Sequence, residues 1–71
     1  MSNSKQKQLE SVPPVLACLN GSDYQMERIA TGERWRGHVV LSRPREFVFY
    51  FNQAKTFRRL PQADFRLFPI E

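Results

Sequence analysis

Apolar and polar side chains alternate along much of the chain after residue 24, and this pattern predicts short β-strands. Two such runs, 24–30 and 33–42, are separated by Thr31-Gly32, a pair typical of a two-residue hairpin turn. That turn sets a register with Glu27 opposite Arg36. One face of the hairpin then collects mostly apolar side chains, namely Tyr24, Met26, Trp35, Val39 and Leu41.

Three further strands follow this hairpin. The run 47–51 is apolar or aromatic at every position, which is typical of a strand covered on both faces or central in a strongly bent sheet. Turns are predicted on either side of it, at Arg43-Pro44-Arg45 and at 52–55. A fourth strand over 56–60 is followed by a break at 61–64, because Pro61 has no amide donor. The last strand covers 65–68 and ends at Pro69.

The segment before the first strand predicts a short helix. Ser11 is a candidate N-cap, prolines fit the first turn, and Asn20-Gly21 supplies a left-handed stop. The alternative is a strand over 15–19 that turns at Asn20-Gly21 into the next strand. The helix is favoured because four apolar residues follow one helical face at i, i+3, i+4 and i+7: Val12, Val15, Leu16 and Leu19.

These elements predict a mainly β protein with one domain over 11–71, preceded by a flexible polar tail over 1–10. The domain is a short helix followed by a five-stranded, strongly bent antiparallel meander. At this length, closing the sheet into a small SH3-type barrel is the simplest way to protect its edge strands.

Charge and composition narrow the classes of function. The net charge is +4, and residues 33–59 alone hold seven basic and two acidic side chains, a local excess of +5 that suggests an anionic partner. The single cysteine, Cys18, and the single histidine, His38, exclude a disulfide framework and argue against a metal site. No catalytic constellation or cofactor motif is present, so we expect neither an enzyme nor a bound cofactor.

The expected location is also constrained. A lone thiol and a polar N-terminus suit the cytoplasm, and no apolar run approaches the ~20 residues of a membrane span.

The candidate binding side chains fall into two groups. Basic residues on the polar face of the first hairpin, with Tyr50 beside them, suit single-stranded nucleic acid. Arginines that flank Pro44 at a hairpin tip suit a phosphate or an acidic protein surface. Arg58 and Arg59 point to opposite faces of their strand, so at most one joins the first group. The candidates are Arg34, Arg36, His38, Arg43, Arg45, Tyr50, Lys55, Arg58 and Arg59. Trp35 is expected in the core, with Arg28 stacked on it at its edge.

The spacing of two glycines carries a family resemblance. Gly32 and Gly37 are separated by four residues with Trp35 between them, and Met26–Tyr50 resembles the first Sm motif of Sm-like and Hfq proteins. Residues 56–69 are similar in outline to the second motif. The resemblance implies a small β-barrel that binds RNA and forms a homo-oligomeric ring, in which the fourth strand pairs with the neighbour's fifth. The alternative is a monomer whose helix covers that edge.

The family's uridine-binding residues are not carried over, because the Lys-His pair of the Hfq ending has no counterpart around 61–64. The expected function is a non-catalytic regulatory protein that binds RNA or other single-stranded nucleic acid. The alternative is an adaptor or inhibitor that docks an acidic partner through Arg43 and Arg45. Rof-type inhibitors of the Rho terminator, which bind a protein, are also similar in outline.

Overall fold

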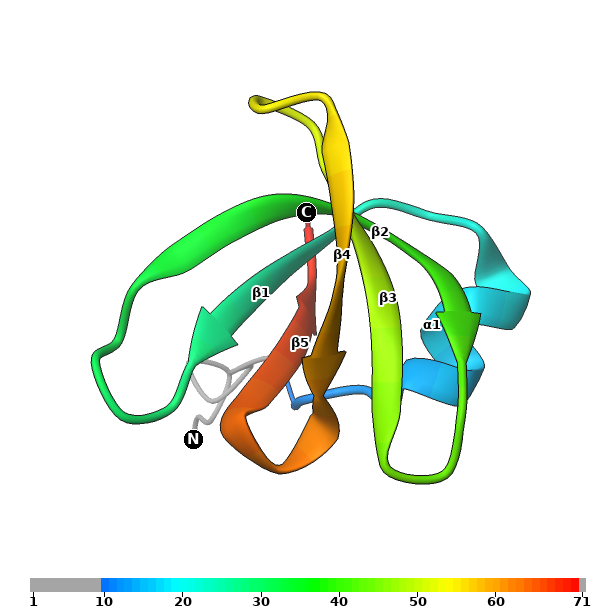
Figure 1. The fold of residues 1–71 in the computed structure, drawn as a ribbon, viewed down its shortest axis with the longest axis horizontal. Coiled ribbons are helices and arrows are strands. Elements are labelled where there is room, and N and C mark those ends of the chain that lie inside the picture. Colours follow the sequence, from blue (N-terminus) through cyan, green and yellow to red (C-terminus); the bar gives the residue numbers. More distant parts are fainter. Residues whose placement is uncertain (1–9, 71) are drawn as a thin grey trace, which may run out of the picture.

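The computed structural model describes residues 10–70. It confirms five strands, and it confirms the helix in preference to the alternative strand. Of the predicted tail over 1–10, all but Glu10 lies outside the described residues. No helix within 10–70 is long and apolar enough to cross a membrane. The elements are α1 (Pro14–Asn20), β1 (Tyr24–Arg28), β2 (Arg34–Ser42), β3 (Glu46–Phe51), β4 (Thr56–Pro61), the 3₁₀ turn η2 (Gln62–Asp64) and β5 (Phe65–Pro69) (Figure 1).

The strands form one antiparallel sheet in the order β4-β3-β2-β1-β5. The first four are a meander, but β5 returns to pair with β1. The predicted closure into a barrel is wrong: β4 and β5 are the two edges of the sheet and do not pair with each other. Between them, η2 turns the chain from β4 back toward β1. Pro61 and Pro69, which lack amide donors, end the two strands.

The register of the first hairpin differs from the prediction by two residues. Met26 lies opposite Trp35, and Glu27 lies opposite Arg34 rather than Arg36. The turn spans 29–32 instead of two residues: the Gly32 N–H donates to the Arg28 carbonyl at 2.7 Å, with Gly32 at φ 78°. A shift of two residues leaves every side chain on its predicted face, so the separation of the two faces is confirmed up to residue 39.

Beyond Val39 a β-bulge reverses the faces of β2. Val39 pairs with Phe49 but Leu41 pairs with Val48, which leaves Val40 as an extra residue. The predicted core position of Leu41 is therefore wrong, and its side chain is 42% exposed.

The inner face of the sheet carries the core. Gly37 is also buried on this face. A Cβ at this position would overlap the Tyr50 carbonyl oxygen and lie 2.8 Å from a ring carbon of Phe49. The bend of β2 against β3 thus requires glycine at this position. The buried apolar side chains are Ala17, Tyr24, Met26, Val39, Phe47, Phe49 and Leu67.

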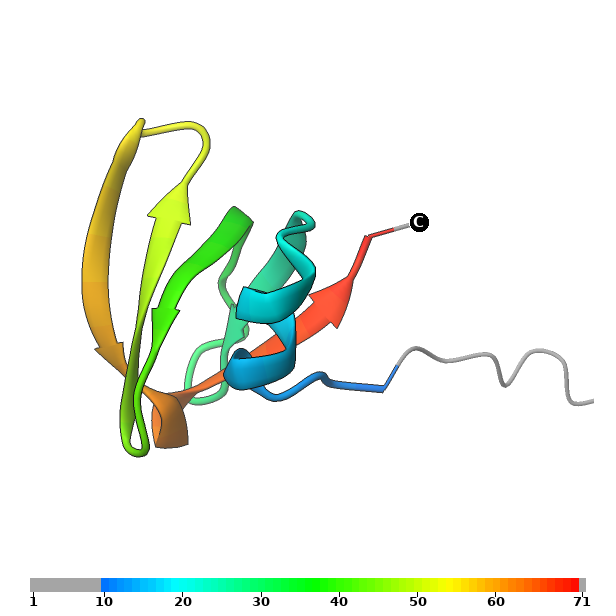
Figure 2. The same cartoon turned by 90° about the vertical axis from the view of Figure 1, so that its right-hand side faces the viewer.

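The helix begins and packs differently from the prediction. Its N-cap is Pro13, not Ser11, because a residue before proline is held in extended backbone and the helix can begin only at Pro14. Gly21 ends it in the left-handed conformation, as predicted. Ala17 faces the core, and Figure 2 shows α1 beside β2. Three of the four residues of the predicted apolar face are instead exposed: Val15, Leu16 and Leu19.

Candidate nucleic-acid interface

Three rings lie in a row across the outer face of the sheet. His38 on β2 is opposite Tyr50 on β3, and Tyr50 is opposite Phe57 on β4. The His38 and Tyr50 rings are stacked, with centroids 5.1 Å apart and an interplanar angle of 30°. Phe57 is 63% exposed. These three side chains, which we call the aromatic row, present ring surface to solvent on three neighbouring strands.

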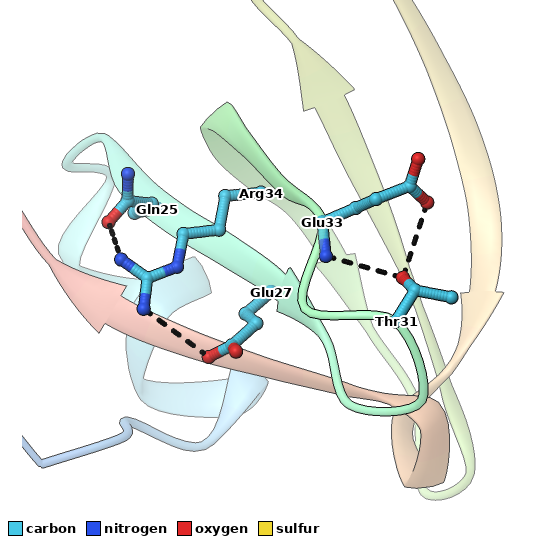
Figure 3. A network of polar contacts seen from close by, with 5 residues as sticks. All are labelled: Gln25, Glu27, Thr31, Glu33 and Arg34. Carbon is cyan, nitrogen blue, oxygen red and sulfur yellow. Dashed lines mark hydrogen bonds and ion pairs between the residues drawn. The ribbon is translucent and has the colours of Figure 1, made fainter.

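Two arginines continue the outer face of β2 beside the aromatic row. Arg34 is held in place, since its guanidinium donates to Gln25 Oε1 at 3.3 Å and lies 3.8 Å from Glu27 Oε1 (Figure 3). Arg36 is exposed and forms no ion pair with any residue in 10–70. One guanidinium is thus oriented and the other is available to a ligand.

An open cavity of about 820 Å³ lies where β2 changes partners. The first half of β2 pairs with β1, while β3 pairs with β2 only from Gly37 onward. In Figure 1 the tip of the β3–β4 hairpin extends away from the tip of the β1–β2 hairpin. We call this cavity the notch, and none of the described residues that line it is acidic. It is lined by Gln25, Arg34, Trp35, Arg36, Phe51, Asn52, Gln53, Ala54, Thr56 and Arg58.

Trp35 forms the apolar wall of the notch. The predicted core position is only partly correct, because Trp35 packs against the core but is half-buried. Its ring meets Phe51 edge-on at 6.0 Å and Phe65 at 6.3 Å, so its orientation is fixed from two sides. A second hollow of about 370 Å³ adjoins the same ring and is lined also by Arg28, and the predicted stacking of Arg28 on Trp35 stays a prediction.

The structure brings some of the predicted site residues together and separates others. Arg34, Arg36 and Arg58 share the notch, and His38 and Tyr50 belong to the aromatic row. Arg59 forms an ion pair with Glu46 at 3.7 Å and lines only the second hollow. Lys55 lies in the β3–β4 turn with φ 56°. Arg43 and Arg45 lie at the β2–β3 turn, at the opposite end of β3 from the notch.

The sequence did not identify Phe57 as a site residue, and it did not predict the notch. Phe57 carries a usable signal, since strand alternation through 56–60 places it on one face with Arg59. The notch has no such signal, because it depends on where β3 stops beside β2.

Arg43 borders a third hollow. This hollow measures about 380 Å³ and lies between the β2–β3 turn and the start of α1. Its lining includes Pro13, Pro14, Val15 and Pro44, and no lining residue within 10–70 is aromatic.

Comparisons of the chain with family models, curated protein sequences and solved structures found no match. The resemblance to Sm-like proteins therefore stays a prediction, and the surface itself carries the evidence for function.

Proposed function

We propose that this protein is a non-catalytic, single-stranded nucleic-acid-binding protein, with RNA as its first candidate ligand. The observation that carries the proposal is the aromatic row on an open sheet face, with Arg36 and Arg34 next to it on β2. Unpaired bases stack on exposed rings, and arginines bind the phosphates between them. A regulatory role in the cytoplasm is part of the same proposal.

The electrostatics of the surface support this mode of binding. The Arg34–Glu27 pair is solvent-exposed on its arginine side, and such surface pairs stabilise a fold by only about 0–1 kcal/mol. A phosphate can therefore exchange for Glu27 at low cost. Binding through arginine also releases counterions, so affinity falls steeply as salt rises.

A homo-oligomeric ring remains part of the proposal, with β4 of one copy beside β5 of the next. Both strands lie at edges of the sheet. The Gln62 N–H donates to the Arg45 carbonyl at 3.0 Å. Because backbone groups along β4 point alternately toward and away from β3, those of Phe57 and Arg59 point away from β3, to the free edge of the sheet. Against this, the Val12 N–H donates to the Leu67 carbonyl at 2.7 Å and covers one acceptor of β5. Light scattering distinguishes a ring mass from a monomer.

The direct test of function is fluorescence anisotropy with a labelled single-stranded RNA of about 12 residues at 50 and 200 mM salt, a range over which phosphate contacts weaken measurably. We expect the wild type to bind, and we expect Phe57→Ser to weaken binding by about fivefold or more, the loss of one stacked base. Ile29→Ser is the matched control, because Ile29 is also exposed, at 47%, but lies in the β1–β2 turn. Absence of binding at low salt contradicts the proposal.

A second candidate function is docking of an acidic protein at the β2–β3 turn. It is favoured by the third hollow, where Arg43 lies beside Pro44 and the exposed Val15. A pull-down from nuclease-treated lysate, compared with the same pull-down by the double variant Arg43→Glu/Arg45→Glu, tests it. A partner that survives nuclease and is lost in the variant supports docking, whereas loss on nuclease treatment supports the nucleic-acid proposal.

A further inference from the structure

The notch exposes one hydrogen-bonding edge of β2. The Arg28 N–H donates to the Glu33 carbonyl at 2.9 Å, and antiparallel alternation then directs the backbone groups of Arg34 away from β1. β3 pairs with β2 only from Gly37 onward, so no strand within residues 10–70 meets Arg34 on that side. Its N–H and C=O therefore face the notch as one donor and one acceptor, side by side.

This edge is too short for an added strand. The Asn52 N–H donates to the Arg36 carbonyl at 3.0 Å and closes the inner end of the gap. Only Arg34 keeps both groups free, whereas β-strand addition uses main-chain hydrogen bonds along several successive residues. A flat ring with an adjacent acceptor and donor fits a single residue. Nucleobases present such edges, as adenine does with N7 and its N6 amino group.

The walls of the notch suit the same ligand. Trp35 offers a ring surface whose orientation is fixed by Phe51 and Phe65. Gln53 and Thr56 supply neutral hydrogen-bonding side chains opposite β2, whereas the Asn52 amide donates to Asp23 Oδ2 at 3.2 Å. The volume of about 820 Å³ lies within the usual range for small-ligand sites, and it leaves room for a sugar and a phosphate beside a base.

We propose that the notch binds one nucleobase of the bound strand, unstacked from its neighbours and placed against Trp35. The edge of the base hydrogen-bonds to the backbone N–H and C=O of Arg34, and the adjoining phosphate contacts Arg36 and Arg58. This inference rests on the proposed function and adds to it, because a base read at a hydrogen-bonding edge makes binding depend on base identity. The aromatic row alone would accept any base.

Trp35 provides the readout, since it is the only tryptophan of the chain. Its fluorescence is followed during titration with 12-residue RNA homopolymers of A, C, G and U. An abasic ribose-phosphate chain of equal length and an oligoglutamate peptide of equal charge serve as controls. We expect quenching by base-containing strands alone. We also expect about a fivefold or larger difference in affinity between the best and the worst base, the usual discrimination of one bidentate contact.

A filled notch gives the second arm of the test. Ala54→Leu adds bulk to the notch wall in an exposed turn, and Ala30→Leu makes the same change in the exposed β1–β2 turn. We expect Ala54→Leu to abolish the base preference and Ala30→Leu to retain it.

The outcomes distinguish the base site in the notch from the proposed binding of single-stranded nucleic acid. If anisotropy reports binding while Trp35 fluorescence stays unchanged or no base is preferred, the inference is overturned and the proposed function stands. Quenching by the abasic chain or by oligoglutamate also overturns it, the latter in favour of an acidic peptide site. Absence of RNA binding at low salt removes the proposed function itself.

Discussion

The two exposed groups of arginines in this protein carry the same charge in different surroundings. Arg34, Arg36 and Arg58 line the notch beside Trp35 and Phe51, and the aromatic row adjoins them. Arg43 and Arg45 flank Pro44 at the β2–β3 turn, and in the described part of the chain no aromatic residue lines the hollow there. Both groups attract anions, but among residues 10–70 only the notch arginines lie beside ring surfaces on which a base can stack, in the notch and in the aromatic row. Positive charge alone therefore does not locate the site.

The difference arises from how β2 is shared between two partners. Its first half pairs with β1 and its second half with β3, so a gap opens beside Arg34 and Arg36 where the pairing changes. The turn at Arg43 and Arg45 joins β2 to β3, which stay paired up to the turn, where the Arg43 N–H donates to the Glu46 carbonyl at 2.8 Å. Arg43 and Arg45 thus lie where β2 and β3 are paired up to the turn, with no gap like the one beside Arg34 and Arg36.

The largest expected effect comes from Gly37, the residue at which β2 changes partners. Gly37→Ala places a Cβ against the Tyr50 carbonyl and the Phe49 ring, so we expect the free energy of unfolding to fall by about 3 kcal/mol or more. Urea denaturation followed by circular dichroism measures this. The matched variant is Gly32→Ala, where nothing lies within 4 Å and only the positive φ opposes a side chain, at about 1–2 kcal/mol. Equal stability of the two variants contradicts the close approach.

The next effect is on RNA affinity without loss of charge. Trp35→Leu removes the ring surface of the notch, and we expect anisotropy to report about tenfold weaker RNA binding, within the range for one stacked base. Trp35→Phe keeps a ring and should retain most of the affinity. Circular dichroism of both variants verifies that they are folded. An unchanged affinity in folded Trp35→Leu indicates that bases do not use this ring.

The part of the fold that the sequence predicts is the part set by local alternation. The strands and the two faces of the first hairpin follow from the alternation of side chains between faces. The predicted register was wrong by two residues, and an even shift leaves each side chain on its predicted face. Barrel closure failed because it depends on the path of the chain through η2 after Pro61. Leu41 and the helix face failed for a similar reason, since a bulge and the fit of Ala17 over the core are set by distant contacts.

The candidate site follows the same division. Parity alone places Arg34, Arg36 and His38 on one face, and the pairing with β3 adds Tyr50. The relation of Arg58 to Arg36 comes from two strands that are not neighbours, so no local pattern contains it. No local pattern predicts the notch either, because its inner end is closed by the hydrogen bond from the Asn52 N–H to the Arg36 carbonyl.

A smaller effect is expected from the ion pair between Arg34 and Glu27 beside the notch. Glu27→Gln removes the carboxylate that lies 3.8 Å from Arg34 and competes with phosphate for it. We expect RNA affinity to rise by about two- to threefold, since a surface pair contributes less than about 1 kcal/mol. Glu46→Gln, which frees Arg59 outside the notch, is the control of equal charge. The same rise in both variants would show that the gain reflects net charge and not Arg34.

Charge reversal in the two arginine groups tests most directly whether RNA binds at the notch arginines and not at the turn arginines. Arg36→Glu/Arg58→Glu and Arg43→Glu/Arg45→Glu change the net charge equally, and all four side chains are exposed. Anisotropy with the same RNA at several salt concentrations is measured for both folded double variants. We expect the notch variant to lose binding and the turn variant to keep most of it, weakened only by the change in overall charge. Loss of binding in the turn variant, with binding retained in the notch variant, would contradict this expectation.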